Sequence, residues 1–317
     1  MLEPRIKTLF TLGKLAGVGS GTLWKISAAD EELSATPGEL AQSNPRVRKA
    51  LEVGGAWERA CMDAEIDLDQ ARDHQAKILH GESPLFPPLL RAASSPPFFL
   101  YVRGRIENLL DPSVAVIGTR QPTAHGQEIT KRLTGMLIEE GWVVVSGLAI
   151  GCDSIAHQTC VQRQGRTVAV LAHGLHTIAP RANAALAEDI LANDGTLVSE
   201  YAFGVEPLPN QFVQRDYIQA GISSGVVMIQ SGITGGSLHA AGRALKLGRL
   251  LVVPAPTDQD RSNNDPKIQA NLAIESMDET RMGTLFGIGP IDPGRIMILR
   301  GRGDYKEMLA RMGPHSS

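Results

Sequence analysis

The sequence predicts an α/β protein, built as a doubly wound, Rossmann-like parallel sheet with a small helical domain at its N-terminus. From Ser113 onward, short runs of Val, Ile and Leu alternate with amphipathic segments of helix length. The runs are apolar almost throughout, which is typical of strands whose two faces are both covered. Strands that alternate with helices favour parallel, right-handed connections.

The first 75 residues predict small helices, because Leu9, Leu12 and Leu15 have helical spacing. The segment Gly17–Gly21 then makes a sharp turn into Thr22–Ile26. Two interpretations remain open for this turn. It is either a helix-hairpin-helix, whose backbone N–H groups would face a phosphate, or a plain corner between two helices.

A proline-rich connector follows the helical region. Proline fixes φ and lacks a donor, so this stretch, which contains Phe86–Leu90 and Phe98–Tyr101, is predicted to be extended or turned and not helical. The prolines are Pro84, Pro87, Pro88, Pro96 and Pro97.

Six strands are predicted in the Rossmann-like part, with helices between them and a weaker pattern after Pro254. The strands are Val114–Ile117, Val143–Ser146, Thr167–Leu171, Thr196–Ser199, Gly225–Ile229 and Leu250–Val253. The helices are His125–Glu140, Ser154–Gln164, Arg181–Asn193, Phe212–Ser223 and Ser237–Leu247. Further on, we expect a helix at Lys267–Glu275, a small strand at Arg295–Leu299 and a helix at Tyr305–Met312. This gives three parts: a helical domain (1–78), the Rossmann-like domain (79–282) and a short C-terminal extension (283–317).

Composition limits the partners and the compartment. Apolar residues make up 43% of the chain, charged residues 21%, and the net charge is −3. A nucleic acid would therefore have to bind at a local patch of positive charge, because the chain as a whole is not basic. No apolar run is long enough to span a bilayer, and the first residues do not resemble a signal peptide. We therefore expect a cytoplasmic protein without membrane contact. The three cysteines lack metal-ligand spacing and are expected to be idle thiols.

Three glycine turns at predicted strand ends indicate a phosphate site. The first is Gly118-Thr119-Arg120, the second runs from Ser146 to Asp153, and the third is Gly235-Gly236-Ser237. Carboxyl ends of parallel strands lie at one edge of the sheet, where helix N-termini offer N–H donors to anions. The dinucleotide fingerprint G-x-G-x-x-G is absent, which argues against NAD or FAD, and no cofactor or metal is expected. His157 is interpreted as a packing or hydrogen-bonding histidine rather than a proton carrier.

The order of these turns, together with Phe86–Leu90, Ser199-Glu200-Tyr201 and Val253-Pro254, resembles the DNA-processing protein A family (DprA/Smf). The resemblance implies a non-enzymatic homodimer that binds single-stranded DNA and acts in recombination and natural transformation with a RecA-type recombinase. It also implies that Arg120 and Arg215 contact the strand, while Asn183 and Ser237 line the pocket. The complete set of candidate DNA- or phosphate-binding residues is Gly118, Thr119, Arg120, Ser146, Gly147, Gly151, Asn183, Arg215, Gly235, Gly236 and Ser237.

Departures from the family pattern leave other functions open. Arg215-Asp216-Tyr217 stands where the family usually has Arg-Asn-Arg, and the loss of one cation beside a new acid should weaken DNA binding by about tenfold or more. The alternative function is a component of an anti-phage defence or toxin–antitoxin system that senses DNA or a nucleotide, or restrains a toxin encoded nearby. A third hypothesis is a nucleotide hydrolase with Glu200 as its acid/base group; no carboxylate lies between Gly236 and Leu247 to serve that role.

Overall fold

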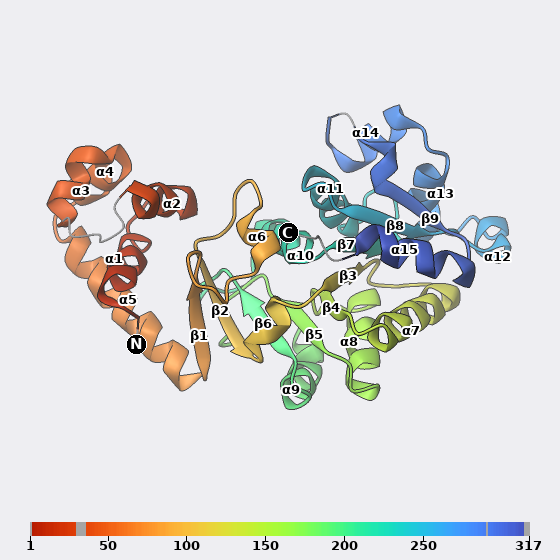
Figure 1. The fold of residues 1–317 in the computed structure, drawn as a ribbon, viewed down its shortest axis with the longest axis horizontal. Helices are drawn as coiled ribbons and strands as arrows, with labels where there is room; N and C mark the ends of the chain where they lie inside the picture. The colour runs from red at the N-terminus through yellow and green to blue at the C-terminus, as the bar shows by residue number, and fades with distance from the viewer. Residues whose placement is uncertain (1, 30–35, 290, 314–317) are drawn as a thin grey trace.

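The computed structural model describes residues 2–29, 36–289 and 291–313. Its centre is a nine-stranded sheet in the order β1-β2-β6-β5-β4-β3-β7-β8-β9 (Figure 1). Strands β3 to β9 are parallel to one another, whereas β2 pairs antiparallel with β6 and β1 pairs antiparallel with β2. The strands are β1 (Ala76–His80), β2 (Phe99–Gly104), β3 (Ser113–Ile117), β4 (Val143–Ser146), β5 (Thr167–Val170), β6 (Thr196–Ser199), β7 (Gly225–Met228), β8 (Leu250–Pro254) and β9 (Ile296–Leu299).

The six predicted strands and the weaker one near residue 296 are confirmed, and a parallel α/β fold follows from them. Residues of β3 alternate between the two faces: Ala115 and Ile117 belong to one core, and Val114 and Val116 to the other. Such alternation within an unbroken apolar run is what a sheet covered on both sides requires.

The helices form two layers around this sheet. The helices on the side of Val114 and Val116 are α7 (Ala124–Glu139), α8 (Cys152–Gln162) and α15 (Tyr305–Met312), while α9 (Ala184–Ala192) packs with the neighbouring strands β5 and β6. The opposite side carries α10 (Pro209–Ile222), α11 (Ser237–Lys246), α13 (Gln269–Glu275) and α14 (Glu279–Phe286). Short helices join them: α12 (Asp258–Ser262), η1 (Ile106–Leu109), η2 (Arg181–Asn183), η3 (Pro266–Ile268), η4 (Pro293–Arg295) and η5 (Arg302–Asp304).

The N-terminal helices lie beside strand β1, at the far end of the sheet from β9 (Figure 1). They are α1 (Pro4–Leu12), α2 (Ser20–Ala29), α3 (Pro37–Ser43), α4 (Pro45–Leu51) and α5 (Ala56–Asp73). Asp67 of α5 ties them to the sheet, because it pairs with Lys14, accepts a hydrogen bond from the Tyr101 hydroxyl and accepts another from the Phe203 N–H at 3.1 Å. The Gly17–Gly21 turn does join two helices, and its role stays a prediction.

The proline-rich connector differs from its prediction in two ways. Residues 88–91 form the one-turn helix α6 (Pro88–Arg91), because Pro88 occupies the first helical position, where a missing N–H is harmless. Residues 99–104 form strand β2, which pairs with both β1 and β6. The domain boundary predicted at residue 78 falls inside β1, and the boundaries otherwise remain predictions.

Candidate nucleic-acid interface

The candidate site lies at the carboxyl ends of β3 and β7, where the sheet order reverses direction along the chain. In open α/β sheets this switch point is the usual place for a ligand. A pocket of about 740 Å³ opens there, between the turn after β3, helix α10 and the loop that leads into α11. Seven predicted residues line it: Gly118, Thr119, Arg120, Arg215, Gly235, Gly236 and Ser237.

The first glycine turn brings Arg120 to the surface. A Cβ on Gly118 would lie 2.5 Å from the Sγ of Cys152, so the strand end has no room for a side chain. The turn is held by the Thr119 N–H, which donates to the Gln230 carbonyl at 2.8 Å. Arg120 is exposed, and no acidic partner for its guanidinium occurs within the part of the chain that the structure describes. Its charge is therefore free to meet an anion.

The second glycine turn already holds an anion that belongs to the chain. Oδ2 of Asp153 accepts the N–H of Gly147 at 3.1 Å and that of Ala149 at 3.4 Å. Gly151 has φ +93°, and a Cβ there would lie 2.4 Å from the Thr119 carbonyl oxygen. Ser146 is fully buried and donates to the Val116 carbonyl at 2.6 Å. Ser146, Gly147 and Gly151 do not line the pocket, although all three were predicted as site residues, and the two glycines allow close packing.

Arg215 is bound by the protein itself. Its Nη1 donates to the carbonyls of Gly147 at 2.6 Å and Val170 at 2.9 Å, its Nε lies 3.2 Å from Oδ1 of Asp216, and the residue is only 6% exposed. Burial raises the pKa of Asp216 to about 6 although Arg215 opposes the shift, and burial also raises the pKa of Asp153. The guanidinium therefore forms an ion pair with Asp216 and lowers the electrostatic cost of the buried Asp153 carboxylate.

The third glycine turn is the open one. Nothing lies within 4 Å of a Cβ built on Gly236, and Ser237 begins helix α11 with its hydroxyl 2.9 Å from the hydroxyl of Ser231. Helix α11 begins at this turn, so the positive end of its dipole lies beside the pocket. The N–H groups of Leu238 and His239 donate to the carbonyls of Gly235 and Gly236 at 3.1 Å and 3.0 Å. Asn271 supports the turn from below, because its amide accepts the Ser231 N–H at 3.0 Å and donates to the Ile229 carbonyl at 2.8 Å.

Asn271 and Asp153 are the contributions that the sequence did not reveal. Asn271 lies in a segment without a recognisable motif, and only the pairing of β7 with β8 brings it under the third turn. Asp153 ends the predicted second glycine turn, and its carboxylate closes that turn by accepting the N–H groups of Gly147 and Ala149. A buried acid directly after a glycine turn is the signal that could have indicated this.

Two predicted groups lie elsewhere. Asn183 is 8% exposed and donates to the Leu148 carbonyl at 2.8 Å, so it braces the second turn from outside the pocket lining. Glu200 follows β6 and is also absent from that lining, although burial raises its pKa to about 7. His157 is fully buried with Nδ1 2.8 Å from the Thr167 hydroxyl, which agrees with a packing role.

A Rossmann-like sheet with an open, cation-bearing turn at its switch point places the chain among α/β proteins whose strand ends are the usual place for a ligand. The family DNA recombination-mediator protein A matches residues 77–282, more than half of the chain. The chain belongs to this family, called DprA or Smf. No helix of the described residues has the length and apolarity of a membrane span.

Curated relatives and solved structures agree with this assignment. The chain is 34% identical over 244 residues to protein Smf of Escherichia coli, covering 76% of the chain and 62% of the relative, and 37% identical over 179 residues to DprA of Bacillus subtilis, covering 56% and 60%. It thus spans about three fifths of the length of these relatives. DprA of Streptococcus pneumoniae shares the fold (TM-score 0.68, 24% identity, 86% and 99% covered). A DprA structure from Helicobacter pylori, described by its single-stranded DNA binding mode, also matches (TM-score 0.60, 25% identity, 75% and 96% covered).

Proposed function

We propose that this protein binds single-stranded DNA through the switch-point pocket and acts in DNA recombination as a binding protein, not as an enzyme. The observation that carries the proposal is the pairing of an exposed, unpaired Arg120 with the open turn Gly235–Ser237 across one pocket. The single-stranded DNA binding mode described for the Helicobacter pylori relative supports it. The two carboxylates at the base, Asp153 and Asp216, are held by Arg215 and backbone N–H groups, so they serve structure rather than acid/base chemistry.

The small number of available cations in this pocket predicts a modest affinity for single-stranded DNA. Because the guanidinium of Arg215 is hydrogen-bonded within the protein, Arg120 is the main positive charge in the pocket that can contact a phosphate. Each phosphate contact on a single strand contributes about 0.7 to the slope of log K against log salt. A pocket with few cations should therefore bind with a shallow salt dependence and without sequence preference.

Fluorescence anisotropy with labelled oligo-dT across a salt series tests the proposal. Arg120→Ala should weaken binding about tenfold or more, because a charged hydrogen bond contributes about 1.5–3 kcal/mol. The matched control is Arg105→Ala: this exposed arginine follows β2, which is antiparallel to β6, and so lies at the opposite edge of the sheet. Equal affinities for the parent and Arg120→Ala, or no binding at low salt, would overturn the proposal.

A homodimer and a RecA-type recombinase partner are part of the proposed role. The apolar surface that the sequence offers for self-association, Leu238–Leu251, is mostly used inside the chain, since Leu238, Ala241 and Leu251 are buried. These buried side chains therefore do not contribute to a dimer surface. Light scattering at micromolar concentration tests the dimer, and a recombinase-loading assay on coated single strands tests the partner.

A further inference from the structure

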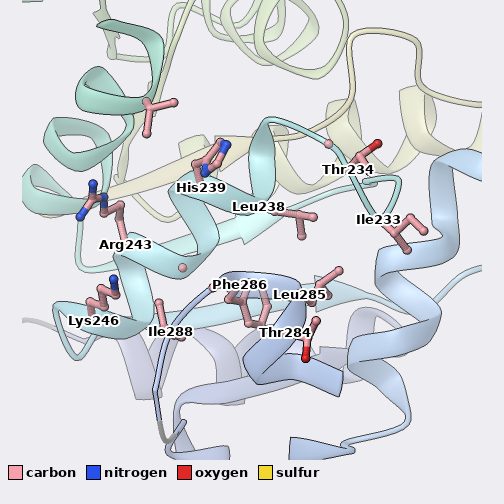
Figure 2. A pocket seen from close by; sticks show the side chains of 14 residues that line it. Ile233, Thr234, Leu238, His239, Arg243, Lys246, Thr284, Leu285, Phe286 and Ile288 are labelled. Atoms are coloured by element: carbon pink, nitrogen blue, oxygen red, sulfur yellow. The ribbon is translucent and has the colours of Figure 1, made fainter. Parts of the chain in front are cut away.

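A second cavity adjoins the switch-point pocket along helix α11. It has a volume of about 390 Å³ and lies between α11 and the end of α14 with the residues that follow it (Figure 2). Val213, Gly235 and His239 line both cavities. A ligand that leaves the first pocket over the first turn of α11 therefore enters the second cavity directly.

Two cationic side chains, Arg243 and Lys246, line this second cavity. His239, Arg243 and Lys246 all line it, and residues three or four positions apart share one helix face. Figure 2 shows Arg243 and Lys246 one above the other on the same side of the helix. None of the lining residues is Asp or Glu. Lys246 is exposed and has no ion-pair partner among residues 2–29, 36–289 and 291–313.

Apolar side chains form another part of the cavity wall. Ile233 is 62% exposed, and Leu285 and Ile288 are half-buried. Helices α11 and α14 approach closely here, since a Cβ on Gly242 would lie 3.1 Å from the carbonyl oxygen of Phe286, the last residue of α14. The wall residues 284–288 follow the region that matches the family, which ends at residue 282.

We propose that this cavity is an extension of the DNA site, in which a single strand leaving the switch-point pocket runs along α11. Its phosphates would face Arg243 and Lys246, and its sugars and bases would lie against Ile233 and Ile288. A row of cations facing an apolar wall, with no carboxylate in the lining, is complementary to a nucleotide chain. Helix α11 rises about 14 Å from Ser237 to Lys246, which adds a second subsite to the first. This inference rests on the proposed function.

Oligonucleotide length separates the two subsites in an experiment. Anisotropy is measured with oligo-dT of about 4 and about 16 nucleotides, the range that single-strand sites cover. Lys246→Glu should weaken binding of the long strand at least fivefold, lower its salt slope by about 0.7 and leave the short strand unchanged. Thr284→Lys, which adds a cation on the exposed side of α14, should strengthen binding of the long strand only. Lys131→Glu on α7, across the sheet, is the matched control.

The outcomes distinguish this inference from the proposed function. If Arg120→Ala weakens neither strand, the proposed function fails and the extension falls with it. If Arg120→Ala weakens both strands while Lys246→Glu acts no more strongly on the long strand than Lys131→Glu does, only the extension is wrong. A change in the mass of Lys246→Glu by light scattering, without a change in affinity, would overturn it in favour of a surface between two copies of the chain.

Discussion

Replacing Arg215 with alanine should destabilise the fold, and not merely weaken ligand binding. The change removes the Nη1 donor from the carbonyls of Gly147 and Val170, and it removes the guanidinium that lies beside the buried carboxylates of Asp153 and Asp216. Removing one partner of a buried ion pair typically costs about 3–5 kcal/mol. We expect a loss of that size in the free energy of unfolding, measured by urea titration at pH 7. Arg120→Ala, at an exposed position, should change it by no more than about 0.5 kcal/mol.

The pH dependence of this loss identifies its cause. The pKa of Asp216 is raised in the folded protein to about 6, so between pH 3.8 and 6 the folded state binds more protons than the unfolded one, and the contribution of Asp216 to stability falls as the pH rises. Without Arg215 the pKa rises further, because the opposing charge is gone. The gap between the parent and Arg215→Ala should therefore shrink from pH 7 to pH 5. A variant within about 1 kcal/mol of the parent at pH 7, or a gap that does not change with pH, would refute the reasoning.

Three further predictions follow from buried groups and close approaches. Burial lowers the pKa of His157 to about 3, so the free energy of unfolding should fall by about 2 kcal/mol between pH 6.5 and pH 5. His157→Asn should reduce this dependence of the free energy of unfolding on pH, as measured by urea titrations at several pH values. The same pH dependence in the variant and the parent would contradict the prediction. Of the thiols, Cys61 should react with a colorimetric disulfide reagent in the native state and the buried pair should not: Cys152 and Cys160. Gly147→Ala should lower the melting temperature, because its Cβ would lie 1.6 Å from Nη1 of Arg215. Gly236→Ala is the control and should leave the melting temperature unchanged, since nothing lies within 4 Å of a Cβ there. Equal melting temperatures of the two variants would refute the packing argument.

The parallel core could be predicted because its signal is local. Runs such as Val114–Ile117 and Val143–Ser146 are apolar on both faces, and this composition alone indicates a covered strand. Strands β1 and β2 could not be found in that way. The half-buried pattern of Ala76–His80 is weak, and β2 follows two prolines, so only pairing with β6 makes it a strand.

The position of the candidate site in the fold could be predicted, but the hydrogen bonds and exposure of each of its side chains could not. Strand ends and glycines gave the edge of the sheet and brought seven of the candidate residues to one pocket. The direction of the Arg215 guanidinium, however, depends on carbonyls at residues 147 and 170, far away in the sequence. A sequence motif shows that a cationic residue is present, whereas the three-dimensional contacts show whether its charge is available to bind a ligand.

That distinction changes how the altered Arg215-Asp216-Tyr217 segment should be understood. Asp216 lies beside Arg215 inside the protein, and the Tyr217 hydroxyl accepts the Ser95 N–H at 2.9 Å, so all three side chains support the scaffold. Asp216 also lines the switch-point pocket, where its ion pair with Arg215 offsets the charge that it would present to a phosphate. If DNA binding is retained, the missing charge must come from elsewhere along the same edge. Arg243 and Lys246 on α11 are the cations that adjoin the pocket, which is why binding of long strands should depend on them more than on Arg215.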